Sequence, residues 1–150
     1  MTAILGRMPI EHVDAPGLYP GAPYHYATVA TGGRSVFAAG ACPIDDLGRV
    51  AHPGDLAAQA RLALDNLLVA LDAAGAGPSD LVKTTVYVAG RSRDDLVRAW
   101  DVISAGLHPA RPPSTLLGVS FLGYPGQLVE IEGIAVTGPA SAAGPGRSSA

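Results

Sequence analysis

The sequence predicts an α+β domain in which two helices lie on one face of a mixed β-sheet. Three patterns support this fold class: a helix-spaced apolar run between Asp55 and Gly75, strict alternation over residues 81–89, and two strand-like runs over 114–119 and 128–137. The chain of 150 residues is most simply one domain. The expected order of elements is β-β-α-β-α-β-β.

The first part of the chain contains much Gly and Pro, and residues 1–21 are expected to form an irregular lead-in. Residues 24–31 and 34–41 are predicted to be strands. The Gly32-Gly33 pair between them is typical of a β-hairpin turn, so we expect these two strands to pair with each other.

The clearest helix begins after Asp55, whose carboxylate is suited to cap it, and ends before Gly75, where a positive φ is needed. Residues 81–89 then form a strand with Val82, Thr84, Val86 and Val88 on one side. Residues 94–103 have helical apolar spacing, and Pro109, Pro112 and Pro113 follow this second helix and terminate it.

The last strand contains two carboxylates, Glu130 and Glu132, in an apolar setting. Residues at i and i+2 of a strand share a face, so both acids point the same way. A half-buried carboxylate requires a partner or a proton. This face is therefore either a polar seam between subunits or a reaction site. Residues 138–150 have the composition of a disordered tail.

The overall composition narrows the class of protein. Hydrophobic residues make up 48% of the chain and charged residues only 15%, which favours an oligomer that hides part of its surface. The net charge of −3 and the scattered basic residues argue against nucleic-acid binding. No apolar run is long enough to cross a membrane, and no secretion signal is visible, so we expect a cytoplasmic protein without membrane attachment.

Other chemistry has little support in the sequence. The lone Cys42 cannot form an internal disulfide, and a cysteine at a strand end is more often an inert packed thiol than a nucleophile. The four histidines lack ligand spacing, so no metal is expected, although His25 is placed to approach a cleft. The Gly-rich segments lack phosphate-loop spacing, and no cofactor is expected.

Several ordered motifs resemble the Rid family, also called the YjgF/YER057c/UK114 family. They are Ala39-Gly40-Ala41-Cys42-Pro43, Gln59-Ala60, Asn66-Leu67, Ala73-Ala74-Gly75, the segment 80–88 and the segment 128–136. The resemblance covers residues 22–137. It implies a chorismate-mutase-like fold, a homotrimer with an inner barrel, and three ligand clefts between neighbouring subunits. Many members hydrolyse reactive enamines and imines to 2-keto acids and ammonia.

The resemblance also implies roles for individual residues. Glu130 falls on the glutamate that positions water, Tyr24 on the cleft tyrosine, and Gly40 on the glycine whose backbone approaches the ligand. The anchoring arginine of the family is replaced by Ser114, since Arg111 lies three residues too early.

Three further positions depart from the deaminating members. Ala39 stands where they commonly have serine, Val97 where they have asparagine, and Leu116 where they have cysteine. We therefore expect a divergent member with weak or absent activity on simple 2-imino acids. Two functions remain open: an imine or enamine deaminase-like hydrolase with an altered substrate, and a catalytically silent trimer that binds a small ligand.

Overall fold

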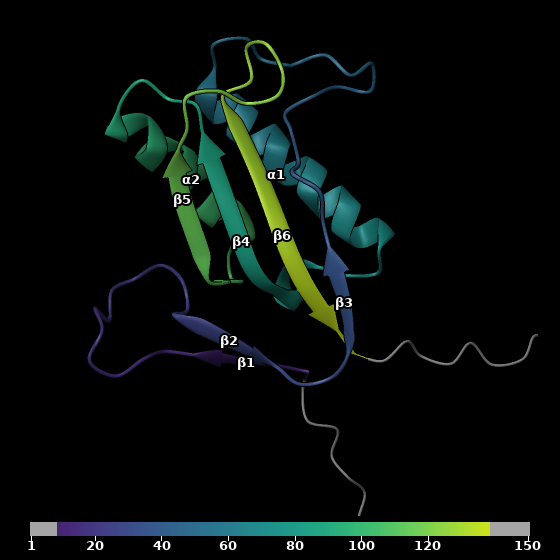
Figure 1. The fold of residues 1–150 in the computed structure, drawn as a ribbon, viewed down its shortest axis with the longest axis vertical. Coiled ribbons are helices and arrows are strands. Elements are labelled where there is room, and N and C mark those ends of the chain that lie inside the picture. Colours follow the sequence, from purple (N-terminus) through teal and green to yellow (C-terminus); the bar gives the residue numbers. More distant parts are fainter. Residues whose placement is uncertain (1–8, 139–150) are drawn as a thin grey trace, which may run out of the picture.

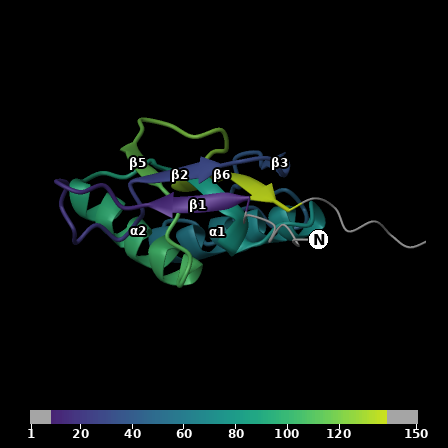
Figure 2. The ribbon, with the colours of Figure 1, turned by 90° about the horizontal axis from the view of Figure 1, so that it is seen from below.

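The computed structural model describes residues 9–138, and both helices lie on one face of a four-stranded sheet (Figure 1). The view from below confirms that α1 and α2 share one side of the sheet (Figure 2). The predicted fold class is thus confirmed. The elements are β1 (Ile10–Val13), β2 (Ala27–Ala30), β3 (Arg34–Phe37), α1 (Leu56–Ala73), the 3-10 turn η1 (Pro78–Asp80), β4 (Leu81–Val88), α2 (Arg93–Leu107), β5 (Ser114–Gly118) and β6 (Val129–Thr137).

The long helix has the ends that its sequence predicts. The backbone N–H of Ala58 donates to the Asp55 carboxylate at 3.0 Å, and Gly75 has a φ of +75°. The second helix is longer than expected and continues to Leu107. Its last residue, Leu107, directly precedes His108 and Pro109. The helix ends there because a proline disfavours helical geometry at the residue that precedes it.

The four-stranded sheet has the order β3-β6-β4-β5. Strand β6 is antiparallel to both β3 and β4, whereas β5 is parallel to β4 and follows it through the crossover helix α2. The helix-facing side of the sheet contains the buried residues of β4 and β6. These include Thr84, Val86, Val88, Val129 and Ile131, none of them more than 1% exposed.

The expected hairpin at Gly32-Gly33 is wrong. Strand β2 pairs with β1, opposing Ala30 to Ile10, while β3 pairs with β6. A Cβ at Gly33 would lie 2.4 Å from the carbonyl oxygen of Thr137, so the chain here runs against the end of β6 instead of folding back on β2. The sequence predicted a strand on each side of the Gly32-Gly33 pair, but it contains no information about the partners of these strands.

The lead-in is also more regular than expected, because β1 lies within it. In Figure 1 the β1–β2 pair crosses below the end of the main sheet, and one end of the pair lies next to the start of β3 and the end of β6. The predicted tail falls almost entirely outside the described residues, and only Gly138 belongs to them.

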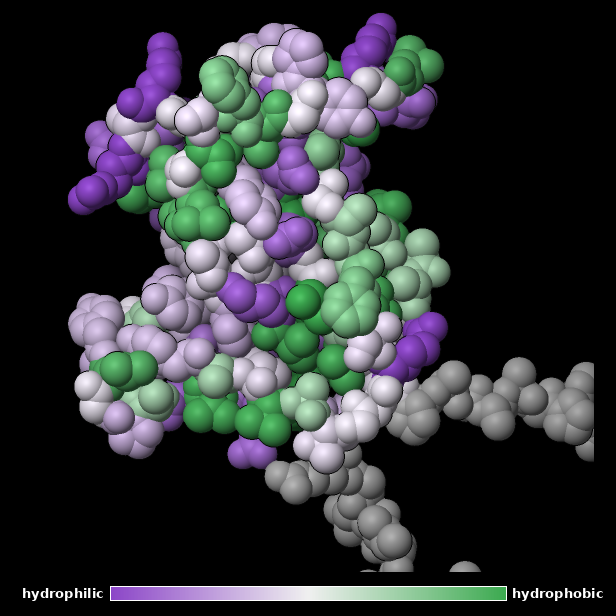
Figure 3. Space-filling model, in the orientation of Figure 1, coloured by the Kyte–Doolittle hydropathy of each residue, from purple (hydrophilic) through white to green (hydrophobic). Residues whose placement is uncertain are grey.

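The face of the sheet opposite the helices is open. Figure 3 looks onto this face and shows hydrophilic side chains among hydrophobic ones. Glu130 and Glu132 of β6 lie on it, since their neighbours Val129 and Ile131 point into the core. Large apolar side chains are exposed as well, including Phe37 at 75% and Phe121 at 88%.

Candidate active site

Glu130 sits at the beginning of β6, opposite Tyr87 of β4. An isolated antiparallel bridge joins Ala41 to Ile131, with backbone N–H···O distances of 2.7 and 3.1 Å. This bridge brings Gly40 against the Glu130 side chain. A Cβ at Gly40 would lie 1.8 Å from Glu130 Oε1, so only glycine leaves room for the carboxylate in this position. The structure thus places two of the sequence-predicted site residues in direct contact.

Gln127 holds the other oxygen of the same carboxylate. Its Nε2 donates to Glu130 Oε2 at 3.1 Å and to the carbonyl of Val129 at 3.2 Å. Its own oxygen accepts from the backbone N–H of Tyr124 at 3.1 Å, and the residue is only 3% exposed. These contacts fix the amide, and the fixed amide orients the Glu130 carboxylate.

Cys42 belongs to this cluster too. Burial raises the pKa of its thiol, and the negative charge of Glu130 raises that pKa further. The thiol donates to the Gly40 carbonyl at 3.7 Å. Cys42 therefore stays protonated near neutral pH and acts as a neutral neighbour of the carboxylate, not as a thiolate nucleophile.

Glu132 has different surroundings from Glu130. The Tyr87 hydroxyl donates to Glu132 Oε1 at 2.8 Å, and this hydrogen bond raises the pKa of the tyrosine. Lys83 lies close enough for the Glu132 charge to oppose the lowering of the lysine pKa by burial. Glu132 is thus part of a polar network across the open face, which fits a structural role.

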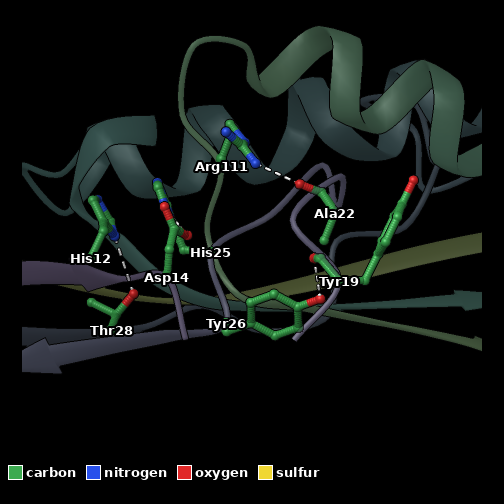
Figure 4. A network of polar contacts seen from close by, with 8 residues as sticks. All are labelled: His12, Asp14, Tyr19, Ala22, His25, Tyr26, Thr28 and Arg111. Atoms are coloured by element: carbon green, nitrogen blue, oxygen red, sulfur yellow. Dashed lines mark hydrogen bonds and ion pairs between the residues drawn. The ribbon is translucent and has the colours of Figure 1, made fainter. Parts of the chain in front are cut away.

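Tyr24 lies elsewhere, beside α2. Its ring packs edge-on against Trp100 at 6.3 Å and against Tyr26 at 5.8 Å. It lines a cavity of about 470 Å³ together with Tyr26 and Arg111. The Arg111 guanidinium donates to the carbonyl oxygen of Ala22 across this region (Figure 4). Arg111 therefore shares a cavity with the predicted cleft tyrosine, although its position in the sequence argues against it as the anchor.

Ser114 and Leu116 lie on the helix-facing side of β5. The Ser114 hydroxyl is 2.6 Å from Thr84 Oγ1 and donates to the carbonyl of Pro112 at 2.9 Å, while Leu116 packs against the core. Glu130 lies on the opposite face, so one chain does not bring these residues together. Ala39 is exposed before Gly40, and Val97 of α2 is 50% exposed.

Comparison with known proteins places this arrangement in a family. The family model described as Endoribonuclease L-PSP matches residues 17–137. A solved structure from Yersinia pestis, described as a Rid-family protein of unknown function, has a TM-score of 0.79 at 31% identity and covers 86% of this chain and 99% of its own. The chain belongs to the Rid family.

Two other relatives widen the comparison. The rat protein named 2-iminobutanoate/2-iminopropanoate deaminase is 32% identical over 136 residues, which is 90% of this chain and 96% of its own. A RutC family protein of Pyrococcus horikoshii is 34% identical over 116 residues, or 77% of this chain and 88% of its own. The family match begins at residue 17, five residues before the start that the motifs indicate.

Two further features of this Rid chain concern cofactors and membranes. Over residues 9–138, no group of three or more His, Cys, Asp or Glu side chains is arranged to hold a metal ion. Within the same range, neither helix is both long and apolar enough to span a bilayer.

Sequence reasoning missed one residue of the Glu130 cluster, Gln127. Gln127 belongs to none of the sequence motifs. Only its burial and its hydrogen bond to the carboxylate show that it orients Glu130. The spacing argues against Arg111 as an anchor, although Arg111 and Tyr24 line the same cavity. The interpretation of Cys42 as an inert packed thiol agrees with its raised pKa.

Proposed function

We propose that this protein is a homotrimer that binds a small imine, enamine or carbonyl metabolite in clefts between subunits and hydrolyses reactive imines there. Glu130 would position the attacking water, and Tyr24 would transfer a proton. The observation that carries the proposal is the fixed Glu130 carboxylate, which lies against Gly40 and accepts a hydrogen bond from Gln127 at 3.1 Å.

The chemistry follows from this geometry. A carboxylate held in place accepts a proton from water as the water oxygen attacks the carbon of the protonated imine. The product of that step is a carbinolamine. Proton transfer to its nitrogen then releases ammonia as the carbonyl forms, so the net reaction adds one water and yields a keto compound and ammonia. The neighbouring Cys42 thiol, with its raised pKa, keeps a second negative charge away from Glu130.

Substrate choice should differ from that of the deaminating relatives. Losing the guanidinium partner of a desolvated carboxylate costs on the order of 2–5 kcal/mol, or roughly 30- to several-thousand-fold in affinity. With Ser114 at that position, we expect weak turnover of simple 2-imino acids. Arg111, which lines a cavity with Tyr24, is a competing candidate for the anchor.

The test is an imine-hydrolysis assay in which an amino-acid oxidase generates the imino acid in situ. Wild type, Glu130→Gln, Ser114→Arg and Arg111→Gln are compared, and Glu132→Gln serves as the matched carboxylate control. Activity gained only by Ser114→Arg would support the missing anchor. Wild-type activity that survives Glu130→Gln would remove the role of Glu130. Robust wild-type activity that Arg111→Gln abolishes would show that Arg111 replaces the expected anchor.

The second candidate function is a catalytically silent trimer that senses a small ligand. It is favoured by the state of Ser114, whose hydroxyl is already engaged by Thr84 and Pro112. If no variant hydrolyses any imine while a keto acid still binds, this function is the better one. We further propose a cytoplasmic location. The proposed trimer can be tested separately, by sedimentation of the purified protein.

A further inference from the structure

A second cavity lies at the other end of the sheet from Glu130. Its volume is about 440 Å³, and it is bordered by β1, the segment just before β2, the η1 turn, the start of β4, the end of α2 and the connection from α2 to β5. Leu81 lines it, whereas Glu130 opposes Tyr87, six residues further along β4. At ~3.3 Å per residue, the two sites are about 20 Å apart along the strand.

The lining of this cavity has an unusual chemistry. Three of the four histidines of the protein, His12, His25 and His108, line it together with Arg111 and Ser79. The other lining residues are apolar or glycine, and among the described lining residues none is acidic. The polar groups around the cavity are therefore mainly hydrogen-bond donors, and most of them are cationic or can become so.

His12 and His25 form the centre of this donor set. Their rings stack in parallel, with centroids 4.5 Å apart and planes inclined by 10°. Figure 4 shows the two side chains next to each other above β1 and β2. His25 Nδ1 is 2.9 Å from an Asp14 carboxylate oxygen, and His12 Nδ1 is 3.2 Å from Thr28 Oγ1. Within residues 9–138, the Nε2 atom of each ring is left for another partner.

The charge balance of the pair favours an anion. Two protonated imidazoles at this distance repel each other, and the positive charge of His25 indeed lowers the pKa of His12, after the larger effect of burial. Asp14 opposes this shift but is paired with His25. Asp80, on the adjacent turn, already accepts from the backbone N–H of Gly77 at 2.8 Å. Both carboxylates therefore already have partners, and part of the repulsion between the protonated His12 and His25 rings is not neutralised. An anionic ligand would relieve this remaining repulsion.

We propose that this cavity is a binding site for a small oxyanion, the phosphate or carboxylate group of a metabolite, held by His12, His25 and His108 with Arg111 beside them. Both groups present oxygens that accept charge-assisted hydrogen bonds from imidazolium and guanidinium. The three histidines are separate from the Glu130 cluster, whereas Arg111 also lines the Tyr24 cavity. The proposed site does not depend on imine hydrolysis.

The experiment titrates the full-length protein with inorganic phosphate and, separately, with acetate, at a fixed pH of about 5.5. A pH well below the usual histidine pKa of ~6.5 is needed because the pKa of His12 is lowered. Chloride keeps the ionic strength constant. Imidazole resonances in NMR spectra report binding. We expect the signals of His12, His25 and His108 to shift saturably while the signal of His52, outside the cavity, stays in place. The anion that binds more tightly identifies the group. Absence of saturable shifts with both anions would overturn the proposal.

Matched variants test which residues bind. His12 and His108 are exposed, so His12→Asn and His108→Asn should fold, and His52→Asn is the control. Each cavity substitution should weaken binding about tenfold, as expected for one charge-assisted hydrogen bond. Equal weakening by His52→Asn, or unchanged binding in the His12→Asn/His108→Asn double variant, would contradict the assignment. Glu130→Gln should bind the anion like the wild type, which separates this site from the proposed hydrolytic function.

Discussion

Replacing Gly40 with alanine tests the contact on which the candidate active site depends. The three heavy atoms nearest to the added Cβ all belong to the Glu130 side chain, at 1.8, 2.7 and 3.1 Å. The backbone of Gly40 does not require a positive φ, so alanine introduces no backbone strain there. The substitution therefore acts through the carboxylate alone.

The size of the effect follows from what the carboxylate must give up. An ordinary contact needs more than 3.4 Å, so Glu130 Oε1 must move by well over 1 Å from its position 1.8 Å from the added Cβ. That movement breaks the hydrogen bond from Gln127 Nε2 and leaves a nearly buried amide without its charged partner. Hydrogen bonds to charged groups contribute about 1.5–3 kcal/mol. We expect Gly40→Ala to lower the free energy of unfolding by about 1–3 kcal/mol and to abolish any activity that requires Glu130.

A double-mutant cycle measured by chemical denaturation is the decisive assay. Shortening Glu130 to alanine removes the three atoms nearest to the new Cβ, so Gly40→Ala should cost much less in the Glu130→Ala background. Gly123→Ala is the matched control, because a Cβ there meets nothing within 4 Å. A cost for Gly40→Ala that persists unchanged without the Glu130 side chain would refute the proposed contact.

Three further predictions follow from the same structure. Burial and, after it, the Glu130 charge raise the pKa of the Cys42 thiol, so iodoacetamide should alkylate this thiol slowly at pH 8 and faster as the pH rises through that pKa. Glu130→Gln should accelerate the alkylation at fixed pH, and an unchanged rate would contradict the coupling. Gln59→Leu should cost about 2–4 kcal/mol in denaturation experiments, since this fully buried amide donates to two backbone carbonyls and accepts from the Leu128 N–H at 2.8 Å. Gly106→Ala should lower the melting temperature and reduce the free energy of unfolding by about 1–3 kcal/mol, because the new Cβ would lie 2.4 Å from Leu64 Cδ2 where α1 and α2 meet. An unaffected melting temperature would mean that the two helices can separate freely.

The sequence predicted those parts of the fold that depend on local chemistry. The Asp55 cap, the positive φ at Gly75 and the two faces of β6 follow from neighbouring residues alone. The pairing of the strands does not follow from neighbouring residues. The Gly32-Gly33 pair is compatible with a hairpin, but the structure pairs β2 with β1 and β3 with β6.

The same limit applies to the sites. Glu130 and Gly40 could be identified by motif, and the structure shows that they touch. The three cavity histidines are separated by 13 and 83 residues (25 − 12 and 108 − 25), so nothing in their spacing indicated that they meet. They meet only because the β1–β2 pair lies beside the turn that follows α2. No pattern along the chain encodes that placement.

The geometry of the sheet also constrains how the proposed cleft can be built. On β4, Tyr87 pairs with Glu130 of β6, and Thr84 pairs with Ser114 of β5. Glu130 and Ser114 are therefore separated by two strand spacings across the sheet and by three residues along it. At ~4.8 Å between strands and ~3.3 Å per residue, their Cα atoms lie about 14 Å apart, with side chains on opposite faces of the sheet. A small imine cannot contact both within one chain. If one ligand does contact both residues, then Glu130 and Ser114 must come from different subunits, and a protein that sediments as a monomer would exclude the shared cleft.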